Sequence, residues 1–91
     1  MSNTFKFVRF TEAGRQSFLD FLQETYGDLG RIDIDACESE AIRDIQSDIN
    51  EGNTSGQWEV SQFKTVSRRT ELFRAHLGSD VEIYGEELFE E

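Results

Sequence analysis

Four carboxylates recur at helical spacing in the middle of the sequence. Glu40, Asp44 and Asp48 follow one another at intervals of four, and Glu51 comes three residues later. In an α-helix this spacing places all four on one flank, about 6 Å apart along the axis, while Arg43 points the other way. Such a row is comparable in scale to the phosphates of a nucleic-acid strand. It predicts a contact face for a partner rich in Lys and Arg, with a solvated helix face as the alternative.

Acidic residues on both sides of this row are further candidates for the same contact. Asp33 and Asp35 lie at the start of the predicted helix, and Glu86 and Glu87 belong to the acidic C-terminal segment 85–91. That segment has no basic residue, and its two apolar side chains could anchor a charged contact. The alternative is a frayed end that only adds solubility.

A basic patch interrupts the acidic pattern between residues 64 and 74. Its members are Lys64, Arg68, Arg69 and Arg74, and aromatic residues lie near them in the sequence. Basic side chains interleaved with aromatics can bind nucleic acid, but the overall charge of the chain opposes that. The patch is expected to pair with the protein's own acids, or to contact an acidic surface of a partner or of a second copy.

The overall charge narrows the choice of partner. Nineteen Asp and Glu residues against nine Lys and Arg give a formal net charge of −10 on 91 residues. Nucleic acids and anionic membranes both bind proteins through Lys and Arg, so neither is expected as a direct ligand. We expect the partner to be a basic protein surface, such as that of a nucleic-acid-binding protein. Monomer and homodimer both remain open.

The acids of residues 33–40 do not match a calcium-binding loop. In an EF-hand starting at Asp33, the fifth position would be Cys37 and the sixth, which needs Gly, would be Glu38. Cys37 and His76 are the only cysteine and histidine, too few for an ordinary zinc site. No metal and no cofactor are therefore expected.

Cys37 and His76 are also the one pair that could act as nucleophile and base. Cys37 falls on the apolar side of its predicted helix, where a buried structural thiol is the ordinary finding. The sequence contains no phosphate-binding glycine loop and no serine-hydrolase motif. The sequence therefore predicts a protein without catalytic residues. A small enzyme or a metal-dependent regulator is the alternative.

Two predicted helices position these side chains. Apolar residues recur at helical spacing over Glu12–Tyr26, with Thr11 as the N-cap and Gly27 as the stop. A second helix is predicted from an N-cap at Asp35 to about Asn50. Both helices have one apolar flank, so both are expected to cover a sheet.

Alternating apolar residues predict strands around the helices. Thr4–Phe10 has aromatic residues on both faces and is predicted to be central in its sheet. Further strands are predicted at Arg31–Asp35, at Gln57–Thr65 and, as a short edge, at Val81–Tyr84. Residues 66–77 fit either a returning hairpin strand or a short helix.

Together these elements predict an α+β fold in a single domain of residues 1–91. The order is β-α-β-α-β-β with a possible short final edge strand. Two helices pack on one face of a mostly antiparallel sheet. Phe18, Leu22, Ile45 and Trp58 are expected to share one core.

In composition the whole chain resembles small phage-encoded inhibitors that imitate DNA, such as anti-CRISPR and anti-restriction proteins. The similarity lies in small size, strong acidity and the lack of catalytic groups, and no single residue carries it. It implies a non-enzymatic inhibitor that occupies the basic nucleic-acid-binding surface of a target protein. The alternative is a protein–protein interaction or adaptor module that binds through its sheet edge or tail and is acidic for solubility.

The expected location is the cytoplasm. A single cysteine permits no internal disulfide, so nothing in the sequence points to an oxidising compartment. Residues 1–10 have neither the long apolar run of a signal peptide nor that of a membrane span.

Overall fold

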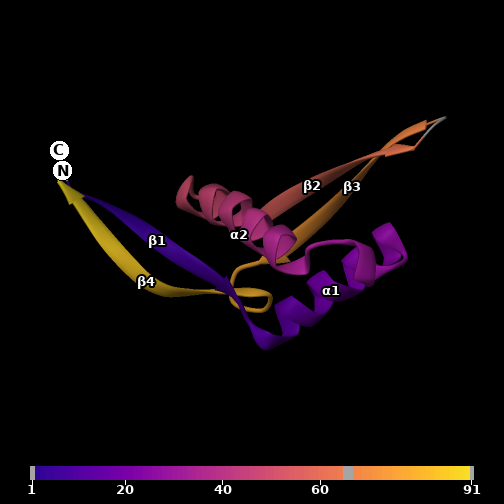
Figure 1. Ribbon diagram of the computed structural model, residues 1–91. Helices are drawn as coiled ribbons and strands as arrows, with labels where there is room; N and C mark the ends of the chain where they lie inside the picture. Colours follow the sequence, from indigo (N-terminus) through magenta and orange to yellow (C-terminus); the bar gives the residue numbers. More distant parts are fainter. Residues whose placement is uncertain (1, 65–66, 91) are drawn as a thin grey trace.

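The described part of the chain forms two helices and four strands, and the strands make two ribbons beside the helices (Figure 1). The computed structural model describes residues 2–64 and 67–90, with side chains for residues 4–60 and 71–88. The α+β class is confirmed, but the element order is β-α-α-β-β-β. The elements are β1 (Ser2–Phe10), α1 (Glu12–Tyr26), a 3-10 turn η1 (Leu29–Arg31), α2 (Ile34–Asn50), β2 (Ser55–Lys64), β3 (Ser67–His76) and β4 (Val81–Glu90).

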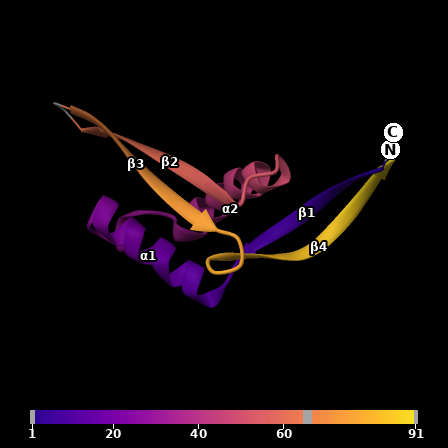
Figure 2. The same ribbon diagram turned by 180° about the vertical axis from the view of Figure 1, so that it is seen from behind.

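The strands pair in twos. In the part of the chain that the structure describes, β1 is antiparallel to β4, and β2 is antiparallel to β3, in two separate sheets. The ribbons extend in opposite directions from the helices, and both termini lie at the tip of the β1–β4 ribbon (Figures 1 and 2). The molecule is therefore elongated, 50 × 26 × 20 Å. The prediction of one sheet with Thr4–Phe10 at its centre is wrong.

Helix α2 closes the outer edge of β1 with its side chains. The backbone N–H groups of Lys6 and Val8 donate to Asn50 Oδ1 and Gln46 Oε1, both at 2.7 Å. Asn50 Nδ2 donates in return to the Lys6 carbonyl oxygen at 2.8 Å. The Asn50 amide thus makes the pair of bonds that a third strand would make, so β1 has no need of a second strand partner.

The same helix also meets the outer edge of β2. The Gln57 N–H donates to Asp48 Oδ2 at 3.1 Å. Close by, a Cβ at Gly56 would lie 2.6 Å from the Cα of Ile45, so only glycine allows this approach. Because α2 occupies the space between β1 and β2 and bonds to both edges, the two ribbons do not join into one sheet.

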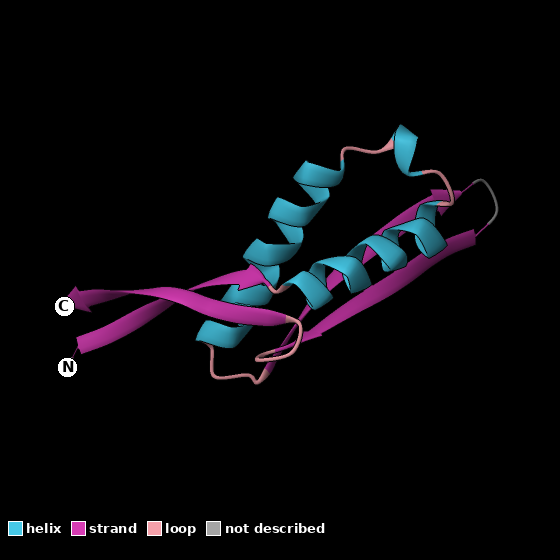
Figure 3. Cartoon of the chain, turned by 90° about the horizontal axis from the view of Figure 1, so that it is seen from below, coloured by secondary structure: helices cyan, strands magenta, loops and turns pink. Residues whose placement is uncertain are grey.

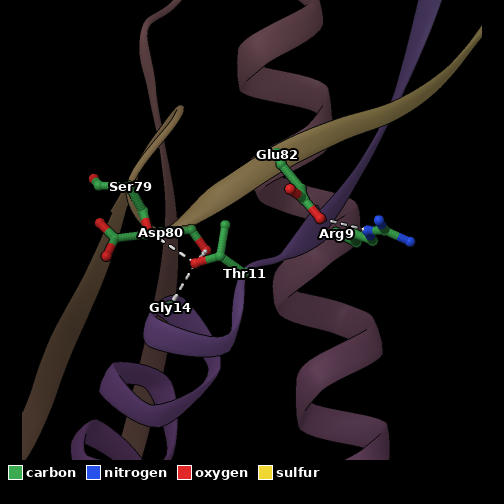
Figure 4. Close-up of polar contacts among 6 residues, drawn as sticks. All are labelled: Arg9, Thr11, Gly14, Ser79, Asp80 and Glu82. Atoms are coloured by element: carbon green, nitrogen blue, oxygen red, sulfur yellow. Dashed lines mark hydrogen bonds and ion pairs between the residues drawn. The ribbon is translucent and has the colours of Figure 1, made fainter.

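Helix α1 begins and ends as its sequence predicts. Thr11 Oγ1 accepts from the Gly14 N–H at 3.0 Å, and Gly27 ends the helix with φ of 80°. Thr11 also fixes the turn before β4. Its Oγ1 donates a hydrogen bond to the Ser79 carbonyl oxygen at 2.7 Å (Figure 4). Its backbone N–H donates to the Asp80 carbonyl oxygen at 2.9 Å. These bonds hold the start of α1 against the base of the β1–β4 ribbon.

The prediction of a strand at Arg31–Asp35 is wrong. The Asp28 carboxylate accepts a hydrogen bond from the Gly30 N–H at 3.0 Å and caps the start of η1. The Asp33 carboxylate accepts one from the Ala36 N–H at 3.1 Å. Asp33 is therefore the N-cap of α2, two residues before the predicted cap at Asp35. The two capping side chains form hydrogen bonds with nearby backbone N–H groups, and such local bonds compete with the bonds of a strand ladder.

The last strands are longer than expected. Residues 67–76 form β3 in a hairpin with β2, so the hairpin interpretation of residues 66–77 is confirmed for the described part. β4 runs from Val81 to Glu90 instead of ending at Tyr84, and the acidic segment pairs with β1. The register shifts beside Val8, and Tyr84 is the extra residue of a β-bulge.

One apolar core lies where the helices meet the ribbons. Phe18, Leu22, Ile45 and Trp58 all belong to it, which confirms the predicted core. The Phe18 ring contacts those of Trp58 and Phe73 at centroid distances of 5.3 and 5.2 Å. Figure 3 shows α1 lying along the β2–β3 ribbon that carries these two aromatics. The other buried members are Val8, Ala41, Ile49, Val60, Ala75 and Val81.

Candidate acidic binding surface

The four carboxylates at helical spacing lie along one flank of α2 and are here called the acidic row. Glu40, Asp44 and Glu51 are exposed and Asp48 is half-buried. The ion pairs among the described side chains join Arg9 to Glu82, Arg15 to Glu38 and Arg31 to Asp28, and none includes a member of the row. The negative charge of the row therefore has no ion-pair partner among the side chains that the structure describes.

A groove between α2 and β2 extends this surface. It encloses about 280 Å³ and is lined by Asp44, Ser47, Asp48, Gln57 and Glu59. Glu59 is not among the predicted contact residues, although the alternation with the buried Trp58 and Val60 places it on the outer face of β2. Three carboxylates and no base line this α2–β2 groove, so it suits a cationic side chain.

Asp48 has two roles in this groove. Its Oδ2 accepts the Gln57 N–H at 3.1 Å, which holds the edge of β2, and the same side chain lines the groove. No group of three or more His, Cys, Asp or Glu side chains suited to a metal ion occurs among the residues described. The carboxylates that line the groove suit an ammonium or guanidinium group, which binds through charge-assisted hydrogen bonds.

The basic patch reaches the acidic surface at one point. Arg74 is exposed on β3, opposite Gln57 in the ladder, and lines a second polar hollow of about 370 Å³ beside Asp48. It forms no ion pair with the side chains described. Lys64, Arg68 and Arg69 have side chains outside the described residues, so the predicted pairing of the patch with the protein's own acids stays a prediction.

The remaining predicted acids lie elsewhere. Asp33 is committed to the N-cap of α2. Asp35 lines a separate groove of about 510 Å³ between α2 and the β1–β4 ribbon, next to Glu38 and Tyr84. Glu86 and Glu87 are exposed on β4 and, as neighbours in a strand, point to opposite faces. The eight predicted contact residues therefore do not form a single surface.

The two candidate catalytic groups are not brought together. Cys37 is near the start of α2, and burial, aided by Glu40 and Asp33, raises the pKa of its thiol. His76 ends β3 opposite Ser55, and its backbone N–H donates to Asp80 Oδ2 at 2.9 Å. β2 meets α2 near Asp48, about 16 Å along the helix axis from Cys37. No hydrogen bond or ion pair among the described residues joins the Cys37 thiol to the His76 imidazole.

The acidic row and the α2–β2 groove are thus the most coherent site that the described residues offer. The charge is negative, the walls are polar, and one helix and one strand fix the geometry. None of the helices described is long and apolar enough to cross a membrane. No family model, curated protein or solved structure matches this chain.

Proposed function

We propose that this protein is a non-enzymatic inhibitor that binds the basic, nucleic-acid-binding surface of a target protein. The observation that carries the proposal is the acidic row on α2, which has no ion pair with the side chains described and which Glu59 widens across the α2–β2 groove. A partner that brings Lys and Arg to this surface meets carboxylates that have no ion pair with the described side chains.

The electrostatics of the row favour such a partner. Like charges one turn apart on a helix cost about 0.2–0.5 kcal/mol per pair, so cations that bind between them relieve repulsion as well as forming new contacts. The spacing of about 6 Å along α2 is comparable in scale to that of phosphates on a nucleic-acid strand. A surface built to bind phosphates would therefore accept the row in their place.

The groove gives the contact a fixed point. An arginine side chain of the target could enter between Asp44 and Glu59, where its guanidinium would meet two carboxylates from different elements. The unpaired Cys37 is consistent with a target in the cytoplasm. Inhibition by occupation, of the DNA-mimic type that the composition resembles in anti-CRISPR and anti-restriction proteins, requires the protein in at least stoichiometric amounts.

Two matched triple variants test this proposal. Glu40→Gln, Asp44→Asn and Glu51→Gln neutralise the row and leave the Asp48 bond to β2 in place. Glu12→Gln, Asp20→Asn and Glu24→Gln neutralise three exposed acids of α1 and change the net charge equally. DNA-binding proteins captured at low salt are then titrated for displacement of their DNA.

The row variant should need about tenfold more protein to displace DNA, a loss of about 1.4 kcal/mol. The α1 variant should behave like the unmodified protein apart from a small general charge effect. Equal losses in the two variants would show that only net charge matters, and the proposal would then be wrong. Displacement at a small fraction of the target concentration would indicate catalysis instead.

A further inference from the structure

The β1–β4 ribbon has one closed edge and one open edge. On β1, the outward N–H groups of Lys6 and Val8 are bonded to α2. In an antiparallel pair, directly opposite residues direct their backbone groups the same way relative to the ladder. Glu86 is opposite Lys6 and Ile83 is opposite Val8, so their N–H and C=O groups point out along the far edge of β4.

The open edge has no partner in the described part of the chain. The outward groups of Ile83, Glu86 and Leu88 take part in no hydrogen bond among the described residues. Figures 1 and 2 both show β1 between α2 and β4, and no helix or strand lies along the other side of β4. An edge of this kind is a template for an added strand.

Exposed apolar side chains accompany this edge. Leu88 is 60% exposed, Tyr84 56% and Ile83 36%. Leu88 and Ile83 stand on the same face of the ribbon as Glu86, because all three are opposite even-numbered residues of β1. An added strand would cover part of this apolar surface in addition to forming backbone bonds.

The charge of β4 selects the chemistry of the added strand. Glu82, Glu86 and Glu87 lie on it without a basic residue between them. Glu82 is already paired with Arg9 at 2.7 Å, and the Arg9 guanidinium lies 5.4 Å from the centre of the Tyr84 ring. Figure 4 shows the Arg9–Glu82 pair beside the base of β4. Glu86 and Glu87 have no such partner among the side chains described.

These charges also exclude a second copy as the occupant. Two β4 strands side by side would place Glu86 and Glu87 of one chain near those of the other, and like charges opposite each other in a ladder are destabilising. Only a partner strand of opposite charge turns the acids into attractive contacts.

We propose that the outer edge of β4 binds an extended segment of another protein, with Lys or Arg at alternating positions, by adding it as a third strand to the β1–β4 ribbon. The added strand bonds to the outward groups of Ile83, Glu86 and Leu88, and its basic side chains, which share one face, meet Glu86. This interface is on the opposite side of the ribbon from α2. It stands whether or not the acidic row binds a target.

A short synthetic peptide that alternates lysine with threonine is the probe for this interface. Its N-methylated form keeps the charge but lacks the backbone donors, so it separates strand addition from simple attraction. Binding is followed at low salt by NMR of the labelled protein. The unmodified peptide should shift and protect the amides of Ile83, Glu86 and Leu88, while the inward amides of Gly85 and Glu87 keep their protection.

Two protein variants complete the test. Glu86→Pro removes an outward N–H and no ladder bond, so the fold should survive, and affinity for the peptide should fall by about tenfold. Glu86→Gln keeps the N–H and removes one exposed charge, so its affinity should fall by only about threefold. If Glu86→Pro fails to fold, the N-methylated peptide alone decides the question.

Several outcomes would overturn the inference. Equal binding of the two peptides would mean attraction without strand addition. Shifts confined to α2 that disappear in the Glu40, Asp44 and Glu51 variant would place the peptide on the acidic row. Absence of binding, or peptide-free dimers that Glu86→Pro abolishes, would also contradict it, since the dimers would identify a second copy as the occupant.

Discussion

The two ribbons have the same antiparallel pairing but are held to the helices by different interactions. The β2–β3 ribbon inserts its inner face into the core and buries Trp58, Val60, Phe73 and Ala75. The β1–β4 ribbon buries Val8 and Val81 at its base, and α2 holds its edge through the amides of Gln46 and Asn50. One ribbon is therefore fixed by apolar contact and the other largely by hydrogen bonds.

This difference bears on function. A ribbon whose face is buried in a core has that face committed to packing, and changes to it cost stability. A ribbon held by one edge keeps its other edge and its outer faces exposed, as Leu88 and Tyr84 are on β4. The β1–β4 ribbon can therefore change its contacts at low cost to the fold, which is what a binding element requires.

The largest effect should come from removing an aromatic of α1 that packs on the β2–β3 ribbon, compared with removing one from the β1–β4 ribbon. Phe18 is fully buried against Trp58 and Phe73, so Phe18→Ala should lower the free energy of unfolding by about 3–5 kcal/mol. Tyr84→Ala on the β1–β4 ribbon should cost less than about 1 kcal/mol, because Tyr84 is more than half exposed. Urea unfolding of both variants measures this, and similar midpoints would refute the difference.

Two glycines, one on each ribbon, should respond differently to an added side chain. Gly56 on β2 faces the backbone of Ile45, and a Cβ there would be 2.6 Å from its Cα, so Gly56→Ala should destabilise the protein by about 1–3 kcal/mol. Gly85 on β4 has as its nearest neighbour the ring of Phe7, 3.8 Å from such a Cβ. Gly85→Ala should be tolerated within about 0.5 kcal/mol. Thermal unfolding of the two variants tests this. Equal losses of stability would mean that α2 shifts to make room for a Cβ at Gly56.

Local signals in the sequence predict the helices and the core well. Thr11 and Gly27 mark the ends of α1 by chemistry that acts within one turn, and the apolar spacing identifies Phe18 and Leu22. The error at Arg31–Asp35 has the same local origin. Alternating isoleucines there fit a strand, but the caps formed by neighbouring aspartates outweigh them.

The separation of the ribbons could not be predicted, because it depends on contacts between distant residues. Gln46 and Asn50 read as ordinary polar residues of a helix, yet they bond to a strand 38 and 44 positions away. The candidate site likewise has one part that the sequence predicts and one part that depends on contacts between distant residues. Helical spacing alone predicts the acidic row, whereas the contribution of Glu59 depends on how α2 packs beside β2.

The smallest effect concerns the hydrogen bonds that hold the β1–β4 ribbon. Asn50→Ala removes both bonds between the Asn50 amide and the backbone of Lys6. Because these groups are only partly buried, water can replace part of what is lost, and the cost should be about 1–2 kcal/mol. The local effect should be clearer than the global one: the Lys6 amide should exchange with solvent faster, while amides within β2 and β3 should be little affected.

Gln16→Ala is the matched control for this last variant. Its amide donates to Asp20 at 3.0 Å on the exposed side of α1, so its removal deletes a helical side-chain hydrogen bond that ties no strand. Its cost should be within about 0.5 kcal/mol, and Lys6 should exchange as before. If Asn50→Ala leaves the Lys6 exchange rate unchanged, apolar contact at Val8 and Val81 suffices to hold the ribbon, and the contrast between the two ribbons is one of degree. If instead Lys6 exchanges faster while β2 and β3 stay protected, the β1–β4 ribbon opens independently of the core.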